Sequence, residues 1–168
     1  MSEFSHRGDE GWRSRLAMLQ DLVDALTAWL TPVALLALRL PVALVFWRSG
    51  RTKVEGWNIF ALQPSQPFLF EHEFGMPFPV LTAHLTAIAE HVLPIMLVLG
   101  LATRFGALGM LVMTAVIQFF VFPDAWFSQH MWWAVTLFAV LVLGPGKLSL
   151  DHLVTSLMRD GDRPPRRI

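Results

Sequence analysis

The stretch VLTAHLTAIAEHVLPIMLVLGLA, from Val80 to Ala102, decides the fold of this chain. It is as long as a helix that crosses a bilayer, which needs about 20 mostly apolar residues. Yet it carries the carboxyl group of Glu90 and the imidazoles of His84 and His91. Such groups cost several kcal/mol when they stand alone in a low-dielectric medium. The stretch therefore predicts a membrane-spanning helix whose polar side chains face partners inside the protein.

Three further segments are long and apolar enough to span a membrane, so that the four predicted spans are residues 27–47, 80–102, 105–122 and 130–148. The chain of 168 residues is 54% hydrophobic and only 15% charged, with a mean hydropathy of +0.50. Soluble domains are about one quarter charged, and four such segments leave little chain to cover them. We expect an all-α fold, an integral membrane four-helix bundle over residues 27–154.

The residues before and after the bundle predict two further elements. In residues 1–26, apolar side chains recur every three or four positions, which is the pattern of an amphipathic helix. This lead is either an interfacial helix of its own or an N-terminal extension of the first span. The segment SLDHLVTSLMR, from Ser149 to Arg159, predicts a short interfacial helix, and residues 155–168 end the chain as a basic tail.

Charge indicates an orientation and excludes some classes of function. Most Lys and Arg residues lie before the first span, in the turn after the second and after the last, which favours the cytoplasm for both termini. Residues 48–79 and 123–129 then form loops on the opposite side. The formal net charge of zero argues against nucleic acid as a partner. The chain has no Cys, so it offers no thiolate and no cysteine-ligated cluster of its own.

Arg39 in the first span and Glu90 in the second are expected at a similar depth. Each lies about 10 residues along its span, and at about 1.5 Å per residue both fall within roughly 5 Å of the bilayer midplane. Because an unpaired charge is costly there, we predict an ion pair between Arg39 and Glu90. The pair is either a structural clamp or part of a working site, for which the catalytic candidates are Arg39, Glu90 and His91.

His84, His91 and Gln118 could extend this pair into a hydrogen-bonded column. Such a column would suit the head group of a quinone cofactor or a proton path, and the alternative is a set of isolated polar residues bonded to backbone carbonyls. His84 and His91 are expected about 10 Å apart along the helix axis, too far to ligate one metal ion together. Haem held by two histidines would need a second helix, such as the one that begins at His130.

The loops on the side opposite the termini carry a second group of polar residues. Charged side chains that could line an outer mouth are Arg48, Arg51, Lys53, Glu71 and Asp124, and the candidate metal ligands there are His72, Glu73 and His130. Carboxylates and imidazoles in this combination can bind metal ions. In loops that face water, however, such side chains are more often simply solvated, and both interpretations stay open.

The chain resembles the DoxX family of small four-helix bacterial inner-membrane proteins. The resemblance rests on ALRLPVALVFWRSGRTKVEGW, AEHVLPIMLVLGLATRFGALGMLVMT, FPDAWFSQHMWW and LVLGPGKLSLDHL, which together span roughly residues 35 to 154. The acidic residue inside the second span, the turn LGLATR and the terminal GPGKLSLD are the more specific pieces. The resemblance implies a multi-pass protein of the bacterial inner membrane, and family membership supports a fold more strongly than a reaction.

Two functions from different classes are compatible with this resemblance. In the first, the chain is a quinone-interacting redox subunit linked to the oxidation of sulfur compounds or to oxidative or metal stress. In the second, it is a non-catalytic membrane partner, a scaffold, or a component that handles small solutes or metals in a stress-response system. The second hypothesis places function in the outer loops and expects a protein partner or a homo-oligomer.

Overall fold

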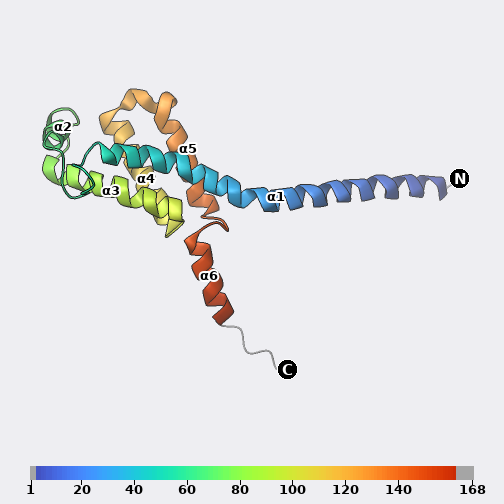
Figure 1. Cartoon of the computed structure of the whole chain (residues 1–168). Helices are drawn as coiled ribbons and strands as arrows, with labels where there is room; N and C mark the ends of the chain where they lie inside the picture. The colour runs from blue at the N-terminus through green and yellow to red at the C-terminus, as the bar shows by residue number, and fades with distance from the viewer. Residues whose placement is uncertain (1–2, 162–168) are drawn as a thin grey trace. The chain divides into compact units, whose positions relative to one another are not determined.

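A computed structural model describes the backbone of residues 3–161 and the side chains of residues 12–159. In this part of the chain, four helices are long and apolar enough to cross a membrane: Trp12–Arg51, Pro79–Leu99, Thr103–Val121 and Pro123–Leu143. The elements of the described residues are all helical, apart from one isolated β-bridge. The predicted all-α fold with four spans is therefore confirmed (Figure 1).

The first helix, α1, runs from Glu3 to Arg51. It continues one turn beyond the predicted end at Trp47, and it includes the described part of the N-terminal lead without a break in helical structure. This favours an extension of the first span over a separate helix, while the location of the lead in the interface stays a prediction. The described residues divide between Ala34 and Leu35 into two compact units. The second unit holds the bundle.

The long loop after α1 is folded and helps to position the site. An antiparallel bridge joins Val54 to Leu62, and the short helix α2, Gln66–His72, lies beside the start of α3 (Figure 1). Within it Phe70 is buried and meets Phe74 edge to face, with ring centroids 5.3 Å apart. We call residues 52–78 and 122–125 the loop end of the bundle.

Helix α3, Pro79–Leu99, forms the second span and ends at a glycine. Gly100 has a φ of 69°, and the N–H of Leu101 donates to the carbonyl of Met96 at 2.9 Å. This is the backbone pattern that closes a helix through a left-handed residue. Helix α4 begins at Thr103, directly after this tight turn. We call residues 100–102 and 144–149 the turn end of the bundle.

The third and fourth spans contain π-helical turns that the sequence did not predict. Helix α4 covers Thr103–Val116 and continues as η1, Ile117–Val121; the fourth span consists of η2, Pro123–Ala125, then η3, Trp126–His130, then α5, Met131–Leu143. The segments η1 and η3 are π-helical. Single π turns are rare and occur often at functional sites.

The fourth span ends earlier than predicted, and a further helix follows it. Helix α5 ends at Leu143, not Leu148, because Gly144 has a φ of 80° and Pro145 cannot donate a backbone hydrogen bond to continue the helix. Helix α6, Leu150–Gly161, lies where a short helix was predicted, and its location in the membrane interface stays a prediction. It crosses the predicted boundary between bundle and tail, and residues 162–168 of that tail lie outside the described part.

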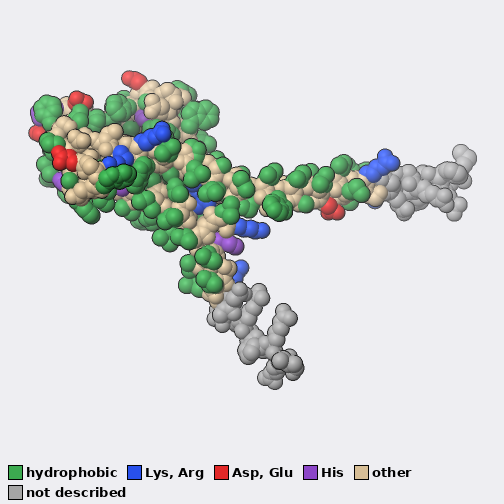
Figure 2. Space-filling view, in the orientation of Figure 1, with side chains coloured by type: hydrophobic (Ala, Val, Ile, Leu, Met, Phe, Trp, Pro, Cys, Tyr) green, Lys and Arg blue, Asp and Glu red, His purple; other side chains and the backbone are tan. Residues whose placement is uncertain are grey.

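The core of the bundle is apolar, and many large hydrophobic side chains are also exposed on its surface. The buried core residues are Val42, Ala43, Phe46, Leu97, Ala107, Met110, Leu137 and Val140, from α1, α3, α4 and α5. Hydrophobic side chains also cover much of the visible face of the bundle (Figure 2). An apolar exterior is what lipid contact requires, since lipid tails replace water as the solvent of these helices.

Candidate functional site

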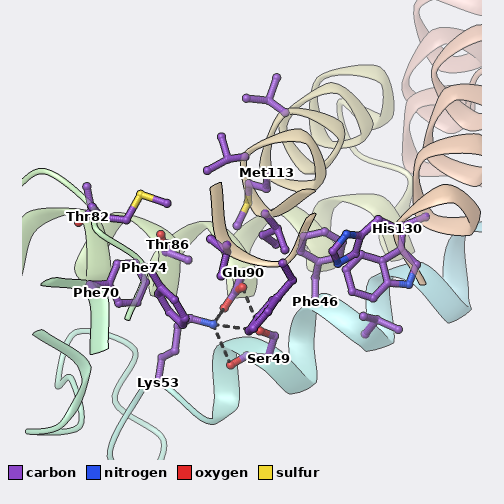
Figure 3. Close-up of a pocket in the computed structure, with 18 of the residues that line it drawn as sticks. Phe46, Ser49, Lys53, Phe70, Phe74, Thr82, Thr86, Glu90, Met113 and His130 are labelled. Carbon is purple, nitrogen blue, oxygen red and sulfur yellow. Dashed lines mark hydrogen bonds and ion pairs between the residues drawn. The ribbon is translucent and has the colours of Figure 1, made fainter. Parts of the chain in front are cut away.

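A cavity of about 360 Å³ lies between the helices near the loop end (Figure 3). Its lining comes from the end of α1, the loop with α2, the first half of α3, the end of the third span and the start of the fourth. Most of it is apolar or aromatic, and its polar members are Ser49, Lys53, Thr82, Thr86, Glu90, Gln129 and His130. Binding sites for small molecules are commonly concave, mostly apolar and equipped with a few placed polar groups.

Lys53 and Glu90 form a buried ion pair on the wall of this cavity. The Nζ atom of Lys53 lies 2.6 Å from Oε2 of Glu90, and the two side chains are 12% and 2% exposed. The hydroxyl of Ser49 donates to Oε1 of Glu90 at 3.0 Å and accepts from Nζ at 2.9 Å. Each carboxylate oxygen therefore has a donor, which compensates part of the cost of removing the charge from water.

Gly50 allows α1 to approach α3 at this pair. A Cβ atom at Gly50 would lie 2.9 Å from the ring of His91 and 3.0 Å from Cβ of Glu90. Both distances are shorter than ordinary van der Waals contact, so a larger residue would push the helices apart. Because Gly50 has no side chain, the two helices come close enough for Ser49 to reach hydrogen-bond distance of Glu90.

The predicted ion pair between Arg39 and Glu90 is wrong. Glu90 pairs with Lys53, whereas Arg39 lies at the turn end, where its guanidinium donates to the carbonyls of Leu97 and Leu148 at 3.4 and 2.6 Å. The prediction misplaced the two helices by at least about two turns, or roughly 10 Å. The reason is that α1 continues to Arg51, so that its last turns, and not its middle, face Glu90.

Arg39 is fully buried, with 0% of its surface exposed, and its partners are mainly backbone carbonyls. Besides Leu97 and Leu148, it donates from Nε to the carbonyl of Leu35 at 3.2 Å. A Cβ atom at Gly100 would lie 2.6 Å from its Nη1 atom. The guanidinium therefore fills its space and joins α1 to the end of α3 and to the segment before α6.

Asp151, in the first turn of α6, caps the start of α4. Its carboxylate accepts hydrogen bonds from the N–H of Ala102 at 2.7 Å, and from the N–H and the hydroxyl of Thr103, both at 2.9 Å. Burial alone would raise the pKa of Asp151, but these hydrogen bonds and the charge of Arg39 lower it below its usual value of 3.8. The ionised carboxylate thus fastens α6 to the turn end.

His84 and His91 do not form the predicted column. Nδ1 of His84 contacts the carbonyl of Val80 at 2.8 Å, and Nδ1 of His91 contacts that of Ala87 at 2.7 Å, each within α3. His91 is buried, and its ring lies 4.9 Å from that of Trp47, edge to face. Neither histidine lines the cavity. The alternative interpretation, isolated polar residues bonded to backbone carbonyls, describes both.

Gln118 pairs with His130 instead of joining the histidines of α3. Oε1 of Gln118 lies 2.7 Å from Nδ1 of His130, and Nε2 of Gln118 donates to the carbonyl of Pro123 at 2.6 Å. His130 is only 2% exposed and lines the cavity. Its ring also lies 4.9 Å from that of Trp133. Since the two partners belong to η1 and η3, the unpredicted π turns bring them together.

The charged residues of the predicted outer mouth are not gathered into one cluster. Arg51 donates to the carbonyl of Gly56 and lies 4.5 Å above the ring of Trp57. Arg48, Glu71 and Asp124 are exposed. Of the five mouth residues, only Lys53 lines the cavity.

The candidate metal ligands are likewise not brought together. His72 stacks on Phe68 with ring centroids 4.2 Å apart, Glu73 is exposed, and His130 is buried beside Gln118. In the described part of the chain, no three His, Asp or Glu side chains are placed to hold a metal ion. The geometry of these loops thus gives no support to a metal site.

Ser49 and Thr86 were not among the predicted site residues, and Lys53 was predicted for an outer mouth without its pairing to Glu90. One signal was available: Ser49 and Lys53 are four residues apart at the end of a span and flank Gly50. Residues four apart share a helix face, and a small residue between them permits a close helix contact. The pairing of Gln118 with His130 had no such signal, because it depends on π turns.

Comparison with known proteins assigns the chain to a family. The family model DoxX matches residues 34–123. An uncharacterized protein of Haemophilus influenzae is 32% identical over 133 residues, which are 73% of this chain and 83% of that protein. No solved structure matches the chain. With four apolar helices and a match over more than half of its residues, the chain is a multi-pass membrane protein that belongs to the DoxX family.

Proposed function

We propose that this DoxX-family protein binds a ring compound of the quinone class in the cavity and acts as a membrane redox subunit. The observation that carries the proposal is the cavity itself, apolar over most of its lining and bordered by the buried Lys53–Glu90 pair. A pocket whose polar groups are few and fixed by hydrogen bonds suits a ligand with a flat apolar body and polar substituents.

The lining fits the head group of such a ligand. The cavity volume of about 360 Å³ lies in the range of pockets that hold small organic molecules. Phe46, Phe70 and Phe74 border it, and aromatic side chains favour offset or edge-to-face contacts with other rings. When bound, a quinone supplies a carrier for two electrons and two protons. The polar groups of the lining that its oxygens would meet are Ser49, Glu90 and His130, and the acceptors among them can bind the hydroxyl groups of the reduced form.

The electrons would come from outside this chain. Since the sequence has no Cys, the protein offers no thiol to pass electrons from a sulfur compound. We therefore place the electron donor on a partner protein linked to sulfur-compound oxidation or to oxidative or metal stress. The excess of Lys and Arg near the termini supports a cytoplasmic location of both termini, so that the loop end faces outward. Membership of the DoxX family supports the bacterial inner membrane.

Equilibrium binding of a short-tailed quinone to the protein purified in mild detergent tests the proposal. We expect saturable binding whose affinity is reduced at least tenfold in Thr86→Phe. The phenyl ring is larger than the threonine side chain and would occupy the cavity that Thr86 lines. Leu108→Phe is the matched control, since Leu108 lies on α4, is 48% exposed and does not line the cavity. Equal binding by wild type and Thr86→Phe would contradict the proposed site.

Mass spectrometry of the purified protein distinguishes the alternative function. A quinone that co-purifies with wild type and is lost from Thr86→Phe supports the redox subunit. A preparation without quinone that carries a soluble protein instead would favour a non-catalytic membrane partner in a stress-response system. That partner would contact the exposed side chains of the loop end.

A further inference from the structure

We infer that the cavity selects the reduced, hydroxyl-bearing form of its ring ligand over the oxidised form. The inference rests on the proposed function and names the redox state that the site prefers. Its basis is the hydrogen-bond roles of the two buried polar side chains that line the cavity, Glu90 and His130. Both side chains border the cavity, and both offer hydrogen-bond acceptors.

The tautomer of His130 follows from its contact with Gln118. The carbonyl of Pro123 can only accept a hydrogen bond, so the side-chain nitrogen of Gln118, 2.6 Å away, must be the donor. This fixes the amide orientation and turns its oxygen toward Nδ1 of His130, at 2.7 Å. An amide oxygen accepts, so Nδ1 carries the proton. In the neutral imidazole the other nitrogen, Nε2, is then an acceptor.

Nε2 is the nitrogen of His130 that remains for a ligand. Within the described part of the chain, the hydrogen bond of the His130 ring is the one from Nδ1 to Gln118. His130 lines the cavity and is 2% exposed, so its ring is held in place and shielded from water. Gln118 is a positioning residue in this arrangement, since it sets the tautomer without lining the cavity.

The second buried group, Glu90, is an acceptor for a different reason. The ammonium of Lys53 has three N–H donors, and its contacts are Oε2 of Glu90 at 2.6 Å, the hydroxyl of Ser49 at 2.9 Å and the carbonyl of Ser49 at 3.5 Å. The hydroxyl of Ser49 donates to Oε1 of Glu90. The donors near the carboxylate are thus used within the cluster, while both carboxylate oxygens keep lone pairs for a further donor.

A ring with hydroxyl groups satisfies these acceptors, and a ring with carbonyl groups does not. Each hydroxyl of a hydroquinone can donate to the carboxylate of Glu90 or to Nε2 of His130. Both side chains border the cavity (Figure 3). A carbonyl oxygen would instead face the lone pairs of these acceptors, and Nε2 of His130 would stay without a donor, which is unfavourable. The other donors of the lining, on Thr82, Thr86, Gln129 and Trp133, belong to side chains that are not buried.

Three probes with one tail and one ring test the inference: a short-tailed hydroquinone kept reduced under anaerobic conditions, the corresponding quinone, and the dimethyl ether of the hydroquinone. Equilibrium dialysis against the full-length protein in mild detergent gives each Kd. We expect the hydroquinone to bind at least tenfold more tightly than the other two. Equal Kd values for hydroquinone and quinone would overturn the inference and leave the proposed function standing. Binding of none of the probes would overturn both.

Two histidine variants locate the preference. In His130→Gln the side-chain amide can present either a donor or an acceptor, so the preference for hydroquinone should fall to less than threefold while both forms still bind. His84→Gln is the matched control, because His84 lies on α3 and does not line the cavity. A preference that survives in His130→Gln, or that falls equally in His84→Gln, would contradict the role of His130.

Discussion

The two buried charged sites of the bundle differ in what surrounds them. At the turn end, the guanidinium of Arg39 is fully enclosed, and its partners are backbone carbonyls and the charge of Asp151. At the loop end, Glu90 and Lys53 are paired, but a cavity of about 360 Å³ lies beside them. At both sites, the removal of charge from water is energetically unfavourable. The difference indicates that a charge buried in a membrane bundle is a candidate for function only where it borders space for a ligand.

Arg39→Met should give the largest loss of stability. Methionine fills part of the volume but leaves the carbonyl of Leu148 without its donor and Asp151 without its neighbouring charge. We expect the free energy of unfolding to fall by about 2–5 kcal/mol. Denaturant titration in detergent micelles measures it. Arg48→Met is the control, since Arg48 is exposed and should change stability by no more than about 0.5 kcal/mol.

Gly100→Ala should come next, because Gly100 is held in the left-handed region against Arg39 and Ser149. A Cβ atom there would lie 2.4 Å from Cβ of Ser149 and 2.6 Å from Nη1 of Arg39. Conformational strain and overpacking together should cost about 2–4 kcal/mol.

Gly75→Ala separates these two contributions. Gly75 has a similar φ of 59°, but in the described part of the chain no atom lies within 4 Å of its added Cβ. It should cost only the conformational strain, about 1–2 kcal/mol. Equal losses for the two alanine variants, compared by thermal unfolding, would mean that the packing at the turn end is not tight.

The ion pair at the loop end should show a smaller coupling in stability. A double-mutant cycle of Lys53→Met and Glu90→Gln isolates it, and we expect a coupling energy of about 1–3 kcal/mol. Removal of either partner alone should destabilise more than removal of both, because it leaves one buried charge unpaired. A coupling energy of zero would mean that the 2.6 Å contact does not stabilise the fold.

The capping carboxylate of Asp151 should give the smallest effect, with a defined dependence on pH. Because its pKa is lowered on folding, its contribution is present above the unfolded value of 3.8 and is lost as the pH falls through the folded pKa. Asp151→Asn should cost about 1–2 kcal/mol near neutral pH. Thermal unfolding between about pH 5 and pH 2 should show a steeper loss for wild type than for the variant. Parallel curves would contradict the assignment.

The four spans could be predicted from the sequence because their signal is simple: runs of apolar residues as long as the bilayer is thick. The register between α1 and α3 could not, since the end of α1 lies beyond its apolar run, at Arg51. That error placed Arg39 opposite Glu90.

The candidate site was predicted in part, because Glu90 and His130 were named but Ser49 and Thr86 were not. The pairing of Gln118 with His130 depends on π turns, for which the sequence carries no clear pattern.

The two sites can be compared in one experiment on two substitutions that remove a charge but keep the size of the side chain, Glu90→Gln and Asp151→Asn. For each, the Kd of the short-tailed hydroquinone and the unfolding temperature are determined in the same detergent. We predict that Glu90→Gln weakens binding at least tenfold, whereas Asp151→Asn lowers the unfolding temperature and leaves the Kd unchanged. The account would be contradicted if Asp151→Asn weakened binding as strongly as Glu90→Gln, or if Glu90→Gln left the Kd at its wild-type value.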